Sequence, residues 1–128
     1  MSFSKRLVIA ASLAAMVAVP TVAFAGEAPA KKAGSVLANP AGMTLYVFDK
    51  DQANSGKSVC NDKCAALWPP FMAPADAKAS GDYTIVTRDD GAKQWAYKGR
   101  PLYLWIKDSK AGDMTGDNVG NVWHVVKD

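Results

Sequence analysis

The two cysteines and the single histidine are the residues with the most specific chemistry. Cys60 and Cys64 are four positions apart. On a helix this spacing puts both thiols on one face, with Cα atoms about 6 Å apart, within the range of a disulfide. Two thiolates and the imidazole of His124 would alternatively supply a three-ligand copper or thiol redox site. The sequence favours a disulfide and leaves the metal or redox site as the alternative.

The other polar residues do not assemble a recognisable catalytic set. His124 follows Trp123 in a strand-like run without a serine or acidic residue in local register, and the chain has no G-x-S-x-G motif. A second group of oxygen-bearing side chains follows the spacing of turn residues rather than that of an EF-hand loop; it comprises Asp108, Asp113, Asp117 and Asn118. We therefore assign no catalytic residue and favour a non-enzymatic protein.

The aromatic side chains offer a candidate binding surface. If Lys98 to Arg100 forms a three-residue hairpin loop, Tyr97 lies opposite Pro101 and Trp95 lies opposite Tyr103. One face of the hairpin would then carry Trp95, Tyr97, Tyr103 and Trp105. Most aromatic residues of a small domain are needed for its core. Left exposed, however, this face would bind a glycan, a peptide or a flat ligand.

These residues lie within a sequence repeat. The stretch from Gly42 to Asp51 returns from Gly99 to Asp108, at an offset of 57 positions, with glycine, leucine, tyrosine and the final lysine–aspartate conserved between the two copies. A spacing kept over ten residues indicates one supersecondary unit used twice.

Short β-branched and aromatic runs separated by turn residues predict a mainly β fold. Strands are expected at residues 36–38, 44–48, 83–88, 94–97, 101–106 and 122–126. A short helix is expected from Cys60 to Leu67, ended by Pro69-Pro70. The expected fold class is a small antiparallel β domain of two related repeats, with one helical turn at the cysteine pair.

The N-terminal residues predict export. Lys5 and Arg6 precede an apolar run, and Ala23-Phe24-Ala25 is a typical cleavage site, so residues 1–25 are expected to be a signal peptide. Residues 26–34 are expected to be a flexible leader and 35–128 a single domain, with repeats at about 35–71 and 83–128. Without Lys5 and Arg6 the chain has 13 basic and 12 acidic residues, which argues against a nucleic-acid partner.

The motif pattern resembles a bacterial family described as a secreted repeat of unknown function, whose members are often predicted lipoproteins. The first copy carries Gly42-x-x-Leu45-Tyr46-x-Phe48-x-x-Asp51, followed by Cys60-x-x-x-Cys64-x-x-x-Trp68-Pro69-Pro70. The second carries Gly99-x-Pro101-Leu102-Tyr103, then Asp108 and Trp123. This chain lacks the lipidated cysteine of the lipoprotein members, so the resemblance implies a free periplasmic or secreted product.

Together these features favour an exported, non-enzymatic envelope protein that binds a ligand or another protein of unknown specificity. We expect a monomer without a membrane span after signal cleavage and without a cofactor, copper being the alternative. The expected partner is another envelope protein or a small ligand.

Overall fold

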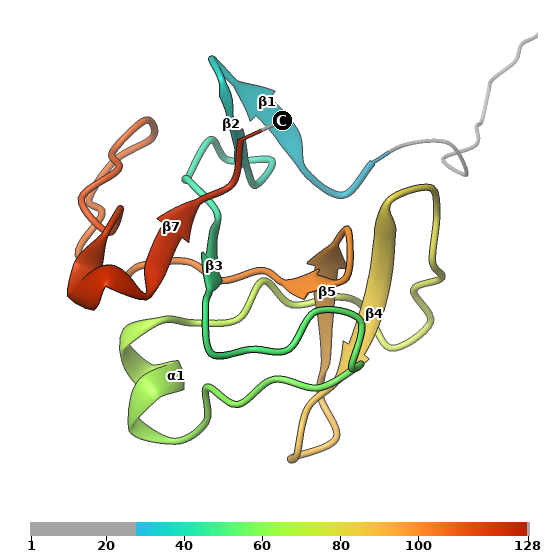
Figure 1. Ribbon diagram of the computed structural model, residues 1–128. Coiled ribbons are helices and arrows are strands. Elements are labelled where there is room, and N and C mark those ends of the chain that lie inside the picture. Colours follow the sequence, from blue (N-terminus) through green and yellow to red (C-terminus); the bar gives the residue numbers. More distant parts are fainter. Residues whose placement is uncertain (1–27, 128) are drawn as a thin grey trace, which may run out of the picture.

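A computed structural model describes residues 28–127, so the expected signal peptide lies outside the described residues. The described part folds into three small antiparallel sheets with one short helix, which confirms the expected fold class (Figure 1). The elements in chain order are β1 (Lys31–Ala33), β2 (Val36–Ala38), β3 (Tyr46–Phe48), α1 (Lys63–Leu67), β4 (Tyr83–Thr87), β5 (Lys93–Tyr97), β6 (Arg100–Pro101), a 3-10 turn (Val119–Asn121) and β7 (Trp123–Val125). The sheets are β1-β2, β3-β7 and β4-β5-β6.

The two repeats are interleaved rather than placed side by side. β3 of the first repeat pairs with β7 of the second, with Phe48 opposite Trp123. In the same way, Leu104 of the second repeat donates its backbone N–H to the carbonyl of Pro69 in the first, at 2.7 Å. The closing segment of each repeat therefore pairs with the central segment of the other, whereas the β1-β2 and β4-β5-β6 sheets each lie within one repeat.

Tyr46 and Tyr103 meet at the centre of this exchange. Each tyrosine donates its backbone N–H to the carbonyl of the other, with N···O distances of 2.8 and 2.9 Å. The two residues occupy equivalent positions in the repeat. A reciprocal contact between equivalent residues is the property of a two-fold axis, so a pseudo-two-fold axis relates the repeats.

Four aromatic rings form a continuous stack across this axis. Trp68 and Trp123 lie face to face, with ring centroids 3.9 Å apart and planes 4° from parallel. Trp105 stacks on Trp68 at 3.9 Å, and Phe48 stacks on Trp123 at 4.2 Å. We call these four residues the aromatic stack. Because each repeat supplies two of the rings and large rings bury much area, the stack joins the repeats.

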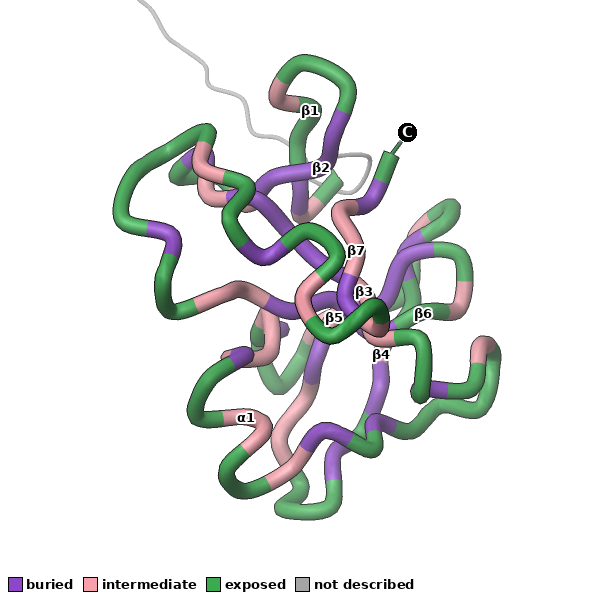
Figure 2. Tube along the Cα trace, turned by 60° about the vertical axis from the view of Figure 1, so that its left-hand side comes forward, coloured by how far each residue is buried: buried purple, intermediate pink, exposed green. Residues whose placement is uncertain are grey.

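A second, more aliphatic cluster fills the other side of the fold. Its buried members include Leu37, Leu45, Tyr97, Leu102 and Val126. Figure 2 shows the buried segments passing through the central strands while the connecting loops remain exposed. Neighbouring residues of the central segments belong to different clusters, Leu102 to this one and Tyr103 to the one with the aromatic stack, so the two clusters lie on opposite sides of these segments.

Order begins earlier than the sequence predicts. β1 lies inside the segment expected to be a flexible leader, where it pairs with β2, so that Lys32 lies opposite Leu37. Gly34, with φ of 68°, forms the turn between the two strands. The sequence does not predict β1 for two reasons. Three residues are too few to show the alternation of a strand, and an exposed pair of lysines has the composition of a linker as well as that of an edge strand.

The β5–β6 hairpin also differs from the expected one. Tyr97 pairs with Arg100 rather than with Pro101, so the turn has two residues instead of three. Those residues, Lys98 and Gly99, have φ of 51° and 85°, as a type I′ turn requires. Lysine is uncommon at positive φ, which is why the sequence favours the longer loop. The change moves the strand register by one residue.

The repeated glycines allow each repeat to approach the loop of the other. A Cβ atom on Gly99 would lie 2.1 Å from the side-chain oxygen of Asn54, and one on Gly42 would lie 2.9 Å from Cβ of Ala111. Both glycines also have positive φ. Glycine is therefore required at both positions for steric and conformational reasons.

Candidate functional site

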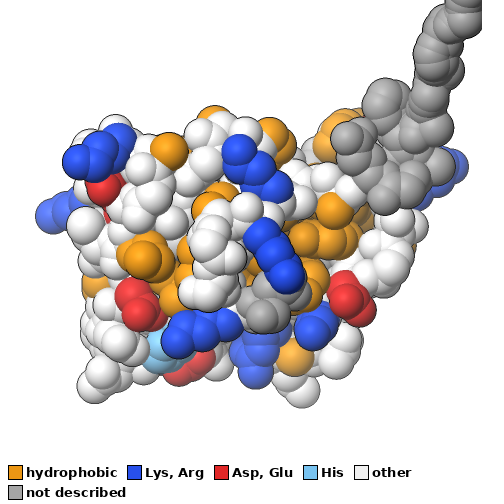
Figure 3. Space-filling model, turned by 90° about the horizontal axis from the view of Figure 1, so that it is seen from above, with side chains coloured by type: hydrophobic (Ala, Val, Ile, Leu, Met, Phe, Trp, Pro, Cys, Tyr) orange, Lys and Arg blue, Asp and Glu red, His pale blue; other side chains and the backbone are white. Residues whose placement is uncertain are grey.

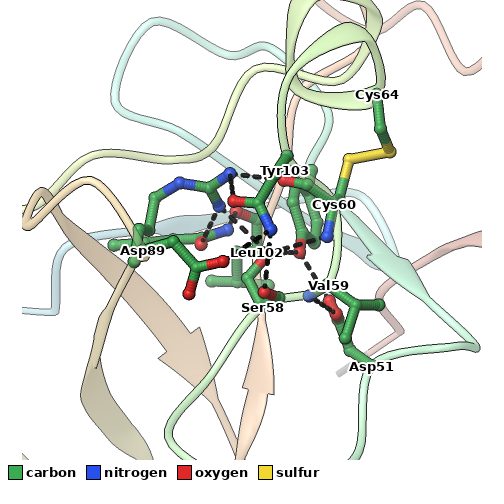
Figure 4. Close-up of a disulfide and its surroundings, with 11 residues drawn as sticks. Asp51, Ser58, Val59, Cys60, Cys64, Asp89, Leu102 and Tyr103 are labelled. Atoms are coloured by element: carbon green, nitrogen blue, oxygen red, sulfur yellow. Dashed lines mark hydrogen bonds between the residues drawn. A yellow bond between two sulfur atoms is a disulfide. The ribbon is translucent and has the colours of Figure 1, made fainter.

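Cys60 and Cys64 form a disulfide across the start of α1. Their Cα atoms are 5.1 Å apart, close to the separation expected for helical spacing. Cys60 is fully buried, whereas Cys64 is partly exposed. The disulfide that the sequence favours is therefore present, and it closes a five-residue loop at the surface (Figure 4).

Arg88, directly after β4, is a buried cation that contacts the disulfide loop. One guanidinium nitrogen donates to Oε1 of Gln94 at 2.6 Å and to Oγ of Ser58 at 3.1 Å. The other donates to the carbonyl of Cys60 and to Oδ1 of Asn61. The side chain is only 6% exposed, and burial of a charge is costly unless it is hydrogen-bonded. Arg88 thus fixes both residues at the start of the disulfide loop.

The network continues from Arg88 to a buried carboxylate (Figure 4). Ser58 Oγ donates to the hydroxyl of Tyr103 at 2.5 Å, and that hydroxyl donates to Oδ2 of Asp51 at 2.5 Å. Burial raises the pKa of Asp51, although its hydrogen bond from Tyr103 and the nearby Arg88 act in the opposite direction. Burial, together with the adjacent carboxylate, also raises the pKa of Tyr103.

A matching pair joins Tyr46 of the first repeat to Asp108 of the second. The hydroxyl of Tyr46 donates to Oδ2 of Asp108 at 2.6 Å, and burial is the largest cause of its raised pKa. Asp108 also accepts the backbone N–H and the hydroxyl of Thr115 at 3.0 and 2.6 Å. The tyrosine of each repeat therefore binds the aspartate of the other and holds the loop that follows it. This reciprocal pairing explains the recurrence of tyrosine and aspartate in the sequence.

An open pocket of about 310 Å³ lies beside the disulfide loop. Asp62, Asp89 and Asp90 supply carboxylates to its lining, and Ala65 and Met72 supply apolar surface. Met72 is 50% exposed. We call this cavity the disulfide-side pocket.

Asp62, in the wall of this pocket, has an unusual backbone conformation. Its φ is 54° and its ψ is −118°, a combination that residues other than glycine rarely adopt. Such a conformation costs about 1–3 kcal/mol and persists only where the surroundings impose it. Here the adjacent Asn61 is held by Arg88, and α1 is tied by the disulfide.

A second open pocket, of about 360 Å³, lies between β1 and the start of β4. Its lining includes Lys31, Leu37, Ser80 and Asp82. It also borders Ala28, at the beginning of the described residues.

His124 lies at the surface in β7 and contacts neither cysteine by any described bond. Its Nε2 is 2.8 Å from Oδ2 of Asp49, and its Nδ1 is 3.2 Å from Oδ1 of Asn118. Figure 3 shows the imidazole beside an acidic side chain. Within residues 28–127, no group of three histidine, cysteine, aspartate or glutamate side chains is arranged to hold a metal ion. The described structure therefore does not bring Cys60, Cys64 and His124 together.

The four predicted ligand-binding aromatics do not form one exposed face. Tyr97 and Trp95 pack with the aliphatic cluster, whereas Tyr103 and Trp105 pack with the disulfide and the other tryptophans. Tyr103 is fully buried. The shorter hairpin turn is the reason: Leu102 donates its N–H to the carbonyl of Trp95, so Tyr103 no longer lies opposite Trp95.

The aspartates after β6 serve turns and loop anchors. Oδ2 of Asp113 accepts the backbone N–H groups of Ser109 and Lys110 at 2.9 and 3.2 Å, and the first of these is the largest cause of its lowered pKa. Asp117 accepts the N–H of Val125 at 3.1 Å. These contacts agree with the turn chemistry expected for this segment.

The fold and the reciprocal pairs define a class: a small β domain built from two interleaved copies of one unit. Comparison with family models identifies the units, because the model described as "Secreted repeat of unknown function" matches residues 29–72 and 84–127. The chain belongs to this family. Comparison with the curated proteins and with the solved structures gives no match. Among residues 28–127, no helix has the length and apolar character needed to cross a bilayer.

Sequence reasoning does not find the Arg88 network. Arg88 follows a strand and precedes a turn, where an arginine is ordinarily exposed, and nothing in its spacing indicates burial. The sequence does contain a signal for the tyrosine–aspartate pairs. Both residues recur at the same offset, whereas most of the loop residues that follow them do not, and this indicates that the two residues have a role common to both repeats.

Proposed function

We propose that this chain is an exported, non-enzymatic binding module of the periplasm or cell exterior, and that its disulfide-side pocket takes a cationic segment of another envelope protein. The observation that carries the proposal is the strained Asp62 turn. A surface turn held in an unfavourable conformation by a disulfide and by a buried arginine is typical of a preorganised site. The proposed binding needs no cofactor and uses a single copy of the chain.

The charge of the pocket selects the partner. Asp62, Asp89 and Asp90 supply three carboxylates. Arg88 also lines the pocket, but it is only 6% exposed and both nitrogens of its guanidinium are engaged in the hydrogen bonds described above. Lysine and arginine side chains are the natural partners of such a rim. The half-exposed Met72 and the adjacent Ala65 give apolar surface on which the stem of a long cationic side chain can lie.

The asymmetry of the repeats supports this location. The tyrosine and the aspartate that form the pairs occur in both repeats, but the cysteines occur only in the first. The position equivalent to Arg88 is Lys31, an exposed residue of β1. The disulfide and the buried arginine that build the pocket therefore occur once, as expected for a binding site that is present in only one half of a pseudo-symmetric fold.

Two variants with the same charge change test the proposal. Asp62→Asn combined with Asp90→Asn removes two carboxylates from the pocket, whereas Asp76→Asn combined with Asp82→Asn removes two exposed ones elsewhere. With a tetralysine peptide as the probe in titration calorimetry, we expect salt-sensitive binding that is lost in the first variant and kept in the second. Equal loss in both variants, or no binding of tetralysine to the parent chain, would contradict the proposal.

Cross-linking locates the contact independently. Met72 and Met114 are exposed to 50% and 49%, so a photoreactive amino acid at either position is equally accessible. We expect the tetralysine peptide to cross-link from position 72 and not from position 114. Cross-linking that is equal at the two positions would show that charge alone, rather than the pocket, attracts the peptide.

A further inference from the structure

We propose that the aromatic stack and its two tyrosine–aspartate pairs form an oxidisable array, which gives one electron to a one-electron oxidant at the surface and holds the resulting radical inside the fold. This activity is independent of the disulfide-side pocket. It uses residues that both repeats contribute.

The stack provides a continuous route from the surface to the core. Successive ring centroids lie 3.9 to 4.2 Å apart, from Trp105 through Trp68 and Trp123 to Phe48. Trp68 and Trp123 are each 4% exposed, whereas the outer two rings are partly exposed. Stacked π systems at van der Waals separation exchange electrons readily, and two parallel indoles share a positive charge. An oxidant that contacts Trp105 therefore has access to the buried rings.

A tyrosine meets each buried indole. The ring of Tyr46 lies edge-on to Trp68 with centroids 5.3 Å apart, and the ring of Tyr103 lies edge-on to Trp123 at 5.1 Å. Both tyrosines are fully buried. A radical formed on either ring would therefore be shielded from solvent and from other molecules.

The paired carboxylates supply the proton acceptors. A phenol becomes strongly acidic when it is oxidised, so it must pass its proton to a base. The Tyr46 hydroxyl lies 2.6 Å from Oδ2 of Asp108, and the Tyr103 hydroxyl lies 2.5 Å from Oδ2 of Asp51. Transfer along these bonds converts a buried carboxylate into a neutral acid, which the low-dielectric interior favours.

The step balances in electrons and protons. The carbonate radical anion takes one electron from Trp105 and becomes carbonate. Tyr46 replaces that electron through Trp68, and its phenolic proton moves to Oδ2 of Asp108. The products are carbonate, a neutral tyrosyl radical and protonated Asp108. Trp123, Tyr103 and Asp51 provide the equivalent route, and ascorbate reverses either route by returning one electron.

Flash oxidation of the whole exported chain by carbonate radical tests the array. Transient absorption and electron paramagnetic resonance distinguish an indole radical from a tyrosyl radical. In the parent chain we expect the indole signal to decay as the tyrosyl signal grows. In the double variant Tyr46→Phe with Tyr103→Phe, which keeps both ring edges, we expect the tyrosyl signal to be lost and the indole radical to persist.

The matched control is Tyr83→Phe with Tyr97→Phe, which removes two hydroxyls outside the array. We expect this variant to form the tyrosyl radical as the parent does. Undiminished tyrosyl radical in the Tyr46 and Tyr103 variant, or its loss in the control, would overturn the proposal. In deuterium oxide the growth of the tyrosyl signal should slow, and an unchanged rate would exclude proton transfer to the carboxylates. Near-ultraviolet circular dichroism of the stacked indoles verifies that each variant is folded.

Discussion

Replacement of Arg88 by methionine tests whether the buried network stabilises the fold. The methionine side chain fills a similar space but removes every hydrogen bond that the guanidinium donates. Oε1 of Gln94 and the carbonyl of Cys60 then lose the donors that the described structure gives them. Ser58 keeps its bond to Tyr103.

The magnitude follows from these two acceptors. A buried polar group without a partner costs about 1–3 kcal/mol, so two such groups lower the free energy of unfolding by about 2–6 kcal/mol. A domain of this size has a total stability of about 5–15 kcal/mol. The loss should therefore be large enough to measure and, near its upper end, large enough to unfold the chain.

Urea denaturation followed by tryptophan fluorescence measures this loss, because three of the tryptophans lie in the aromatic stack. Arg100→Met is the matched control, since Arg100 is exposed in β6, and we expect it to change stability by less than about 0.5 kcal/mol. Arg88→Lys should fall between the two, because one ammonium group cannot span both acceptors. If Arg88→Met lowers the free energy of unfolding by less than about 1 kcal/mol, the reasoning is refuted, because this is below the cost of leaving even one buried acceptor without a donor.

The remaining predictions concern the disulfide, the turn, the interleaving and pH. Replacing Cys60 and Cys64 with serine should cost about 2 kcal/mol by the chain-entropy model for a five-residue loop, measured as a shift of the urea midpoint at constant slope. Gly99→Ala should destabilise by more than about 1 kcal/mol, because its Cβ would meet a neighbouring loop at positive φ; an unchanged thermal midpoint would contradict the described turn. The isolated fragment 83–128 should lack the folded circular dichroism of the whole chain, and a folded monomeric fragment would disprove the interleaving. The pKa of Asp51 in the folded state is raised above its ordinary value of 3.8, so between these two pKa values the folded state binds more protons than the unfolded state. The free energy of unfolding should therefore fall as the pH rises from 3.8 through the raised pKa. This fall should be absent in Asp51→Asn, and a fall that persists in the variant would assign the effect to another group.

The sequence predicts those features that local patterns determine. β4, β5 and β7 lie where β-branched and aromatic runs place them, and the cysteine spacing predicts the disulfide. The repeat offset predicts two related units, and the family match follows it closely. These features depend on residues near one another in the chain, so periodicity and turn chemistry are sufficient.

Local sequence patterns do not predict the features that depend on contacts between the two repeats. Pairing of β3 with β7 joins residues that are 75 to 79 positions apart, as in Phe48 with Trp123 and Tyr46 with Val125, and no local rule states which strand is the partner. The turn at Lys98 is one residue shorter than expected, and this difference shifts the register so that Trp95 no longer lies opposite Tyr103. The set of side chains on one face of the hairpin therefore depends on the length of the turn. Arg88 is missed for the same reason: its partners at Ser58 and Cys60 belong to the other repeat.

The interleaving also bears on how such a fold can diversify. Two separate copies of one unit, assembled about a true two-fold axis, would carry every substitution twice, once on each side. In a single chain the two sides are encoded independently, so a disulfide at Cys60 and a buried Arg88 can arise on one side alone. The tyrosine–aspartate pairs at the axis cannot diverge so freely, because each pair takes one residue from each half. Joining the two repeats in one chain thus preserves the symmetry of the residues at the axis and allows the outer loops of the two repeats to differ.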